Sequence, residues 1–183
     1  MCGIVGYAGP REASEVLLEG LTRLEYRGYD SAGVAILNGS GIQVRKAVGR
    51  LANLKSQLSG NAAHGGLGIG PPRRATHGAP SVVNSHPHVS FGGKLSIIHN
   101  GIIENYRELK NELIAQGIKF RSDSDTEVVA HLVARAYDGD LLKAFHAVLK
   151  RLRGAYALAL CHASEPDLSL CTRRGSPLVL GFV

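Results

Sequence analysis

The sequence predicts an α+β domain, and two observations support this fold class. Short apolar runs of strand length gather in an N-terminal and a C-terminal block. Amphipathic stretches with apolar residues at helical spacing lie between them. The 183 residues are 44% hydrophobic and 20% charged, a globular composition that is long enough for one sizeable core. Because no internal repeat or interdomain linker is evident, residues 1–183 are expected to form one domain.

The N-terminal half is predicted to contain a strand, a helix, a hairpin and a second helix. Its first apolar run ends at the turn signal Gly9-Pro10, and the helical pattern that follows stops at Gly28. The run Asn38-Gly39-Ser40-Gly41 is a hairpin signal between two apolar runs. The predicted elements are a strand over residues 3–8, a helix over 11–26, strands over 34–37 and 42–47, and a helix over 49–58.

The C-terminal half is predicted to carry three helices between strands. Ser124 and Glu127 have the spacing of a capping box, and Asp140 is a good N-cap. The predicted elements are a strand over residues 94–98, helices from about 106 to 116, from 125 onward and from 141 to 152, and strands over 155–162, 168–172 and 178–183.

Composition argues against several classes of protein. The net charge is +6, but the basic residues are dispersed and Trp is absent, so nucleic-acid binding is not expected. The longest apolar run is too short to span a bilayer, and the N-terminus lacks the pattern of a signal peptide. We therefore expect a cytoplasmic protein with no membrane contact.

The three cysteines predict neither a disulfide scaffold nor a zinc ribbon. Their number is odd and no Cys-X-X-Cys pair occurs. Cys161 and Cys171 lie in predicted strands and are expected to fill the core. His86 and His88 have no carboxylate or cysteine at ligand spacing, so no metal site is expected there.

Cys2 is the first candidate for chemistry. If the initiator Met is removed, Cys2 carries a thiol and a free α-amine on one residue. A thiol of pKa about 8.5 needs help to ionise at neutral pH, and an α-amine of pKa about 7.7–8.0 can act as its base. The alternative explanation is a buried strand cysteine, so the other motifs must decide.

Three further stretches carry candidate ligand-binding groups. Arg73, Thr76 and His77 suit capture of a carboxylate, although a solvated basic loop is the alternative. Asn100-Gly101 follows a strand and offers an amide NH₂ with an unobstructed backbone N–H, as an oxyanion hole requires, although it could be a tight turn. Asp125 could bind an ammonium group or cap its helix. A carboxylate site together with an ammonium site indicates an amino acid.

Several of these motifs occur together in a known family. Residues 26–33, a polar and glycine-rich stretch, would otherwise be either a plain connection or a site loop. The stretches that carry the resemblance are Met1-Cys2-Gly3-Ile4-Val5-Gly6-Tyr7, Glu25-Tyr26-Arg27-Gly28-Tyr29-Asp30-Ser31-Ala32-Gly33, Ala75-Thr76-His77-Gly78, His99-Asn100-Gly101-Ile102-Ile103-Glu104-Asn105-Tyr106 and Ser122-Asp123-Ser124-Asp125-Thr126-Glu127. In these stretches the chain resembles the glutaminase domain of the glutamine–fructose-6-phosphate aminotransferase (isomerizing) family, also called glucosamine-6-phosphate synthases. Related amidotransferases share Cys-Gly-Ile and Asn-Gly, and the longer motifs favour the aminosugar enzymes.

The resemblance implies a four-layer αββα sandwich of the N-terminal-nucleophile (Ntn) hydrolase type. It implies that the chain releases ammonia from L-glutamine without a metal or cofactor. The implied roles are Cys2 as nucleophile, Asn100 and Gly101 as oxyanion hole, Arg73, Thr76 and His77 for the α-carboxylate, Asp125 for the α-ammonium, and His86 and Arg27 in support. In the family, a sugar isomerase domain uses the ammonia on fructose 6-phosphate, and the full-length enzyme is expected to be a homodimer.

Two departures from the family pattern affect these expectations. Pro71-Pro72 precede Arg73 and remove two backbone donors, which would displace Arg73, and Arg74 replaces a tryptophan associated with gating ammonia transfer. The glutaminase domain is also expected to be C-terminally incomplete, with the isomerase domains absent, which would leave a sheet edge unpaired. The alternatives are another class II amidotransferase domain or a catalytically silent fragment.

Overall fold

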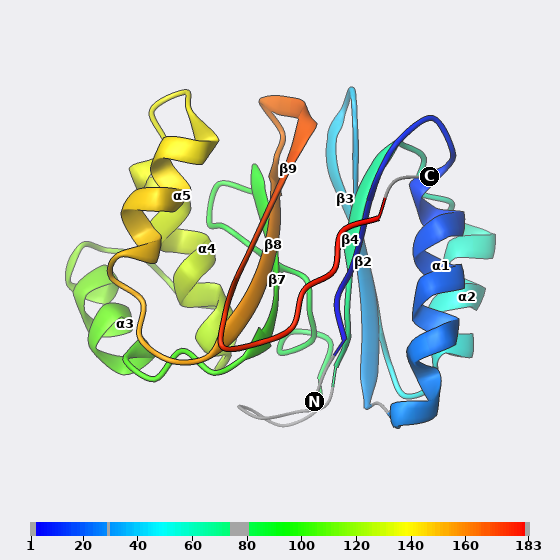
Figure 1. The fold of residues 1–183 in the computed structure, drawn as a ribbon, viewed down its shortest axis with the longest axis horizontal. Helices are drawn as coiled ribbons and strands as arrows, with labels where there is room; N and C mark the ends of the chain where they lie inside the picture. Colours follow the sequence, from blue (N-terminus) through cyan, green and yellow to red (C-terminus); the bar gives the residue numbers. More distant parts are fainter. Residues whose placement is uncertain (1–2, 29, 74–80, 182–183) are drawn as a thin grey trace.

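The computed structural model describes residues 3–28, 30–73 and 81–181, except for the side chains of Arg27, Pro72 and Arg73. Two antiparallel sheets lie face to face, and each is covered on its outer side by helices (Figure 1). The four layers are therefore helix, sheet, sheet and helix, which confirms the predicted αββα sandwich. None of the helices in the described ranges is long and apolar enough to cross a membrane.

The first sheet is built from the N-terminal part of the chain. Its strands run in the order β1-β4-β2-β3, and β5 also pairs with β2. Helices α1 and α2 cover its outer face (Figure 1). The elements are β1 (Val5–Ala8), α1 (Ala13–Leu24), the 3₁₀ turn η1 (Glu25–Arg27), β2 (Ser31–Asn38), β3 (Gly41–Val48), α2 (Leu51–Gly60), β4 (Leu67–Gly70) and β5 (Pro72–Arg73).

The second sheet is built from the rest of the chain. Its strands run in sequence order, β6-β7-β8-β9, with β9 at one edge. Helices α3, α4 and α5 cover its outer face (Figure 1). The elements are β6 (His88–Val89), β7 (Leu95–Gly101), α3 (Tyr106–Ala115), α4 (Asp125–Ala136), α5 (Leu141–Leu149), β8 (Tyr156–His162) and β9 (Glu165–Arg174).

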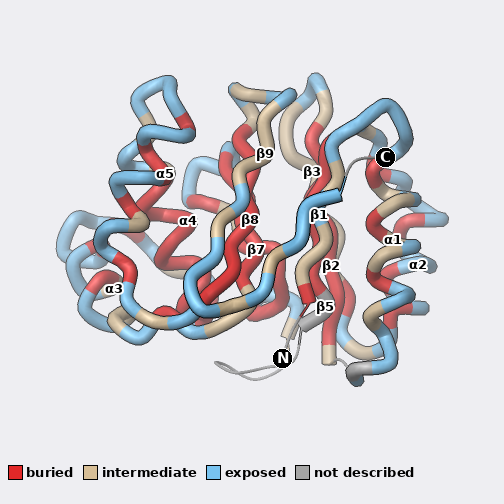
Figure 2. Tube along the Cα trace, in the orientation of Figure 1, coloured by how far each residue is buried: buried red, intermediate tan, exposed pale blue. Residues whose placement is uncertain are grey.

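Strand alternation divides the buried apolar residues among three clusters. Figure 2 shows in red where buried residues lie along the chain. Successive residues of a strand face opposite sides of the sheet. On β7, Leu95 and Ile97 pack against the outer helices, whereas Ile98 packs between the sheets. On β2, Val34 and Ile36 face α1 and α2, and the alternate residues meet the other sheet. Each sheet is therefore buried on both faces.

The structure corrects three of the predictions. Residues 31–33, predicted as the end of a loop, form the start of β2 because they pair with β3. The predicted strand over 178–183 does not form in residues 178–181, where the structure has no regular element. Cys161 is buried as predicted, but Cys171 is exposed, because β9 is the edge strand of its sheet. The other predicted helices and strands are found, with shifts at their ends.

Candidate functional site

The structure describes only part of the predicted site. Cys2, Thr76 and His77 lie outside the described residues. The backbones of Arg27 and Arg73 are described, in η1 and β5, but their side chains are not. Asn100, Gly101, Asp125 and His86 are described in full, and the geometry of the site is therefore built from the second sheet and α4.

Asn100 and Gly101 form the end of β7. Gly101 has φ of +135°, and a Cβ there would lie 2.1 Å from the carbonyl oxygen of Ala155, so only glycine fits. By strand alternation, Asn100 lies on the same face of the sheet as Ile98, toward the first sheet, and its side chain is half-buried. The strand thus ends with an amide side chain between the sheets and an unhindered glycine backbone.

Asp125 begins α4 and is 3% exposed. Its Oδ2 accepts a hydrogen bond of 2.9 Å from the backbone N–H of Ile103, just after the Asn100-Gly101 pair. The preceding residue, Ser124, is the N-cap, and its hydroxyl accepts from the Thr126 N–H at 3.2 Å. Ser124, rather than Asp125, therefore caps the helix, while the positive end of the helix dipole favours the buried carboxylate of Asp125.

The predicted capping box forms only in part. Glu127 does not return a hydrogen bond to Ser124, because its carboxylate is taken up by the chain before the helix. Oε1 accepts from the Arg121 N–H at 2.9 Å, and Oε2 accepts from Ser122 N–H at 2.7 Å and Ser122 Oγ–H at 2.5 Å. The His131 ring, whose Nδ1 accepts from a backbone N–H, directs Nε2 to Oε1 at 3.2 Å. Glu127 is thus a buried anchor for residues 121–122.

These contacts determine the ionisation of Glu127. Burial by itself raises the pKa of this carboxyl, but the hydrogen bonds from His131, Ser122 and the two backbone N–H groups outweigh burial and lower the pKa to about 2. In the unfolded chain the same carboxyl has its ordinary pKa of 4.5. The ionised form is therefore favoured by the fold, so Glu127 contributes stability above pH 4.5 and loses it as the pH falls toward 2.

We expect Glu127→Gln to lower the free energy of unfolding by about 3 kcal/mol at pH 7, because amide oxygen and NH₂ cannot accept the same set of hydrogen bonds. The deficit should shrink as the pH falls from about 4.5 toward 2, where the wild-type carboxyl also becomes neutral. Urea unfolding at a series of pH values measures it. The exposed Glu108 on α3 supplies the control, Glu108→Gln. A deficit for Glu127→Gln that stays constant with pH would contradict this account.

The two prolines do not shift the backbone of Arg73 out of register. Strand β4 pairs with β2 through Ile69 opposite Ala35, and β5 pairs with β2 through Pro72 opposite Ala32. Three residues separate the two pairs on both strands, so the register is the same on each side of Pro71. Arg73 itself lies opposite Ser31. Pro71 interrupts the strand without slipping it, so the backbone displacement expected from Pro71-Pro72 does not occur.

The loop that carries His86 packs directly against the first sheet. A Cβ on Gly33 of β2 would lie 2.2 Å from the carbonyl oxygen of His86, so glycine permits the contact. His86 is buried, and its Nε2 lies 3.1 Å from Thr126 Oγ1. His86 therefore lies between β2 and the start of α4, where a role in supporting the site is expected for it. Within the described ranges, no group of three or more His, Cys, Asp or Glu side chains is arranged so that it could hold a metal ion.

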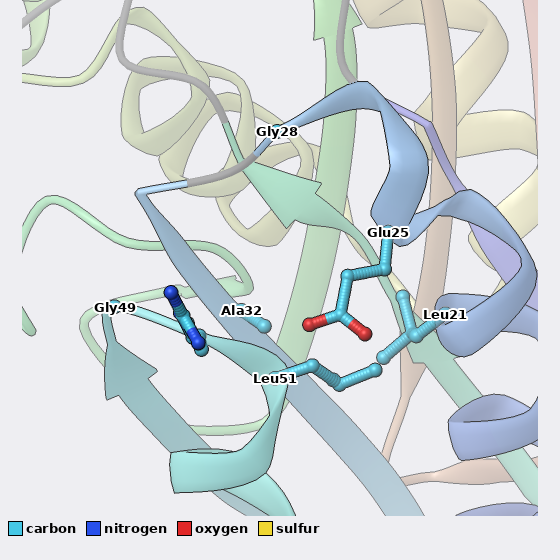
Figure 3. Close-up of a pocket in the computed structure, with 7 residues that line it drawn as sticks. Leu21, Glu25, Gly28, Ala32, Gly49 and Leu51 are labelled. Carbon is cyan, nitrogen blue, oxygen red and sulfur yellow. The ribbon is translucent and has the colours of Figure 1, made fainter.

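A cavity of about 310 Å³ lies on the outer, helix-covered side of the first sheet, near the end of α1 and the start of α2. Figure 3 shows Leu21, Glu25 and Leu51 pointing toward one another around it. Glu25 belongs to one of the motifs that suggested the family, but its side chain is exposed and the neighbouring lining is largely apolar. Of the residues that the structure describes in full, none that lines this cavity belongs to the predicted site, and we assign the cavity no role in the chemistry.

The comparisons with known proteins agree with this geometry. Residues 75–180 match the family model of the glutamine amidotransferase domain, which is more than half of the chain. The chain belongs to the glutamine amidotransferase domain family. Membership in this enzyme family was predicted from the motifs and is confirmed.

Relatives of the amidotransferase domain include glutamine–fructose-6-phosphate aminotransferases (isomerizing). The protein of that name from Fusobacterium nucleatum is 54% identical over 183 residues, all of this chain but 30% of the relative. The one from Symbiobacterium thermophilum is also 54% identical, over 182 residues and 30% of its length. The domain therefore spans about a third of the length of these relatives.

A solved structure confirms the Ntn-type fold of the amidotransferase domain. The glutamine phosphoribosylpyrophosphate amidotransferase from B. subtilis superposes with a TM-score of 0.77 at 30% identity, covering 89% of this chain and 35% of that one. The allosteric regulatory enzyme of purine biosynthesis gives the same TM-score at 31% identity, covering 88% of this chain and 35% of that one. These likenesses extend the agreement from sequence motifs to the arrangement of the layers.

Sequence reasoning missed the buried polar residues behind the amidotransferase site. His99, Ser122 and Thr126 occur within the motifs, but none of them is predicted to have a role, and Glu127 is interpreted only as the partner of Ser124 in a capping box. All four missed residues are buried. The hydrogen bonds of His99 with Thr126 and of Ser122 with His88 join residues 27 and 34 positions apart. The available signal was a histidine at the end of an otherwise apolar strand, where a buried polar group needs a partner.

Proposed function

We propose that the chain hydrolyses the side-chain amide of L-glutamine, releasing ammonia and L-glutamate through a thioester on Cys2. The observation that carries this proposal is the buried Asp125 carboxylate bound to the Ile103 N–H, two residues beyond the Asn100-Gly101 pair. An anionic site for an ammonium group thus adjoins an amide and glycine that suit an oxyanion. Membership in the amidotransferase family identifies a ligand with both groups as glutamine.

The choice of Cys2 as nucleophile is supported by the packing of the start of the described chain. Ile4 packs against the inter-sheet cluster that contains Ile98, two residues before Asn100. In the proposal, the thiol of Cys2 is the nucleophile and its own α-amine is the base. Gly3, between Cys2 and Ile4, is buried against Leu24, which leaves little freedom for the start of the described chain.

In the proposed reaction, Cys2 Sγ attacks the side-chain carbonyl carbon of glutamine, and the thiol proton passes to the α-amine. The tetrahedral oxyanion is stabilised by the Asn100 amide and the Gly101 N–H. As the carbon–nitrogen bond breaks, the α-ammonium of Cys2 returns the proton to the leaving NH₂ group and ammonia departs. The α-amine of Cys2 then takes a proton from a water molecule that attacks the thioester carbon. The carbon–sulfur bond breaks, L-glutamate leaves, and the sulfur takes the proton back to restore the thiol.

The remaining residues are proposed to hold the amino-acid end of glutamine. Arg73, Thr76 and His77 would bind the α-carboxylate, and Asp125 the α-ammonium, with His86 and Arg27 in support. The unbroken register of β5 supports the use of Arg73, because its backbone stays beside β2 despite the prolines. No metal or organic cofactor is required by this chemistry.

The relatives indicate the purpose of the ammonia. We propose that this chain is the glutaminase half of a cytoplasmic protein that makes glucosamine 6-phosphate from fructose 6-phosphate, with a sugar isomerase domain as its partner and a homodimer as the full-length state. This chain spans 30% of the length of those relatives. The isolated chain is therefore expected to form glutamate from glutamine but no glucosamine 6-phosphate.

The test is glutamate release from L-glutamine by purified chain whose initiator Met is shown by intact mass to be absent. We expect steady turnover that does not require fructose 6-phosphate. Folded, correctly processed chain without turnover would overturn the proposal and would favour a silent member of the family. If the chain alone formed glucosamine 6-phosphate from L-glutamine and fructose 6-phosphate, the proposal that a separate isomerase domain is needed would be overturned.

A further inference from the structure

We propose that Thr126 is a positioning residue for glutamine, because its buried hydroxyl ties α4 to β7 and so fixes the Asp125 carboxylate. The inference rests on the proposed function and assigns part of its substrate recognition to a residue that does not touch the substrate. Thr126 follows Asp125 directly in α4, and its partner His99 directly precedes Asn100 in β7. One hydroxyl therefore joins the residues adjacent to the two candidate binding groups.

The contacts of Thr126 are all with buried groups. Thr126 is 0% exposed, and its Oγ1 lies 3.0 Å from His99 Nδ1 and 3.1 Å from His86 Nε2. The same oxygen is 3.4 Å from Asp125 Oδ1, and His99 Nδ1 is 3.7 Å from Asp125 Oδ2. Both carboxylate oxygens of Asp125 thus face groups of this cluster, in addition to the Ile103 N–H on Oδ2.

The hydrogen bonds in the cluster can be assigned from the surroundings of His99. Among the described residues, His99 Nε2 is buried and has no hydrogen-bond partner. A proton on Nε2 would be left buried and unpaired, whereas a proton on Nδ1 points at Thr126 Oγ1 and toward the Asp125 carboxylate. We therefore assign the Nδ1–H form to His99, which donates to Thr126. The Thr126 hydroxyl then donates its own proton to Asp125 Oδ1, 3.4 Å away.

This arrangement has a consequence for substrate selection. Glutamine places its α-ammonium and its side-chain carbonyl a set number of bonds apart, so the Asp125 carboxylate must keep one position relative to Asn100-Gly101. Strand β7 and helix α4 lie in different layers, and the bond between His99 and Thr126 joins them next to both groups. Without the Thr126 hydroxyl, Asp125 keeps the Ile103 N–H on Oδ2 but loses the hydroxyl beside its Oδ1.

The experiment compares two substrates. L-glutamine carries the α-ammonium, and 4-carbamoylbutanoate is the same molecule without the amino group. Thr126→Val has nearly the same shape as threonine but lacks the hydroxyl. We expect it to lower kcat/KM about tenfold for L-glutamine, mainly through KM, the effect of one well-placed hydrogen bond. We expect kcat/KM for 4-carbamoylbutanoate to stay within about twofold of the wild type, because Asp125 has no ammonium to bind there.

Three variants separate positioning from general damage. Thr126→Ser keeps the hydroxyl and should have the wild-type KM. If Thr126→Val does not fold, Thr126→Ala serves as a second variant without the hydroxyl. In an Asp125→Asn background, Thr126→Val should have no further effect on KM, as expected of two residues that act as one unit. Equal losses on both substrates, or a full further loss in the Asp125→Asn background, would overturn the proposal and indicate a structural role only.

A binding measurement separates this inference from the proposed function. Calorimetry with L-glutamine on the Cys2→Ala chain needs no turnover. Binding that weakens about tenfold when Thr126→Val is added supports the inference. Equal affinity with and without that change would overturn the inference alone. Failure of the Cys2→Ala parent to bind glutamine, together with no turnover by the wild type, would overturn the proposed function and this inference with it.

Discussion

Cys2→Ala is expected to reduce glutamate release from L-glutamine by at least about a thousandfold, to the background of the assay, because no other group can form the thioester. The variant is expected to fold, because alanine keeps the Cβ of cysteine and removes only the thiol sulfur. It should also still bind glutamine. The measurement is glutamate formation under saturating glutamine, with unfolding by urea as the check on folding.

The other two cysteines are matched controls for this prediction. Cys161 is buried, and burial raises the pKa of its thiol to about 12, so it is almost entirely protonated at neutral pH and a poor nucleophile. Cys171 is exposed on the edge strand, far along the chain from the proposed site. Cys161→Ala and Cys171→Ala should retain turnover, and a glutamine-analogue electrophile should label Cys2 first. Equal labelling of Cys2 and Cys171 would contradict a working site.

Asn100→Ala is expected to lower kcat by about 10²–10³, which corresponds to about 3–4 kcal/mol of transition-state stabilisation. The amide NH₂ would donate to oxygen that becomes charged only as Cys2 attacks, so the loss should fall on kcat while KM changes little. The side chain is half-buried at the end of β7, and the glycine that follows keeps its backbone geometry in the variant.

The control for Asn100 is Asn53→Ala on the outer side of the first sheet. Asn53 is exposed on α2 and donates to the carbonyl oxygen of Val48 at 2.8 Å, so its replacement also removes one amide hydrogen bond. Turnover should be unaffected. If Asn100→Ala instead raised KM with kcat unchanged, Asn100 would bind the ground state of glutamine and the oxyanion assignment would be wrong.

Most elements of the fold were accessible from local patterns. The helix-spaced leucines of α1, the Asn-Gly signal between β2 and β3 and the N-cap Asp140 of α5 each act within a few residues, so their effect is visible in a short window. The errors fell where distant partners intervene. Ser31 is a strand residue because it pairs with Val48 and Arg73, and Cys171 is exposed because no strand lies beyond β9 in its sheet, as far as the described residues extend.

The candidate site divides in the same way. Asn100, Gly101 and Asp125 could be nominated from the chemistry of their side chains and neighbours alone. The hydrogen bonds between Glu127 and residues 121–122 could not be predicted from the sequence, because the Ser124–Glu127 spacing is also that of a capping box. The role inferred for Thr126 depends on His86 and His99, 40 and 27 residues away, which no local pattern connects to it.

Short-range periodicity and residue chemistry were enough to establish the α+β class, the helices, the hairpin and the groups able to bind an amino acid. The long-range pairing of strands decided the register of Arg73, the face on which Asn100 lies and the partners of Thr126. The reason is physical: these features depend on burial and hydrogen bonds between residues far apart in the chain, and buried polar groups take whichever partner the packed layers bring within reach.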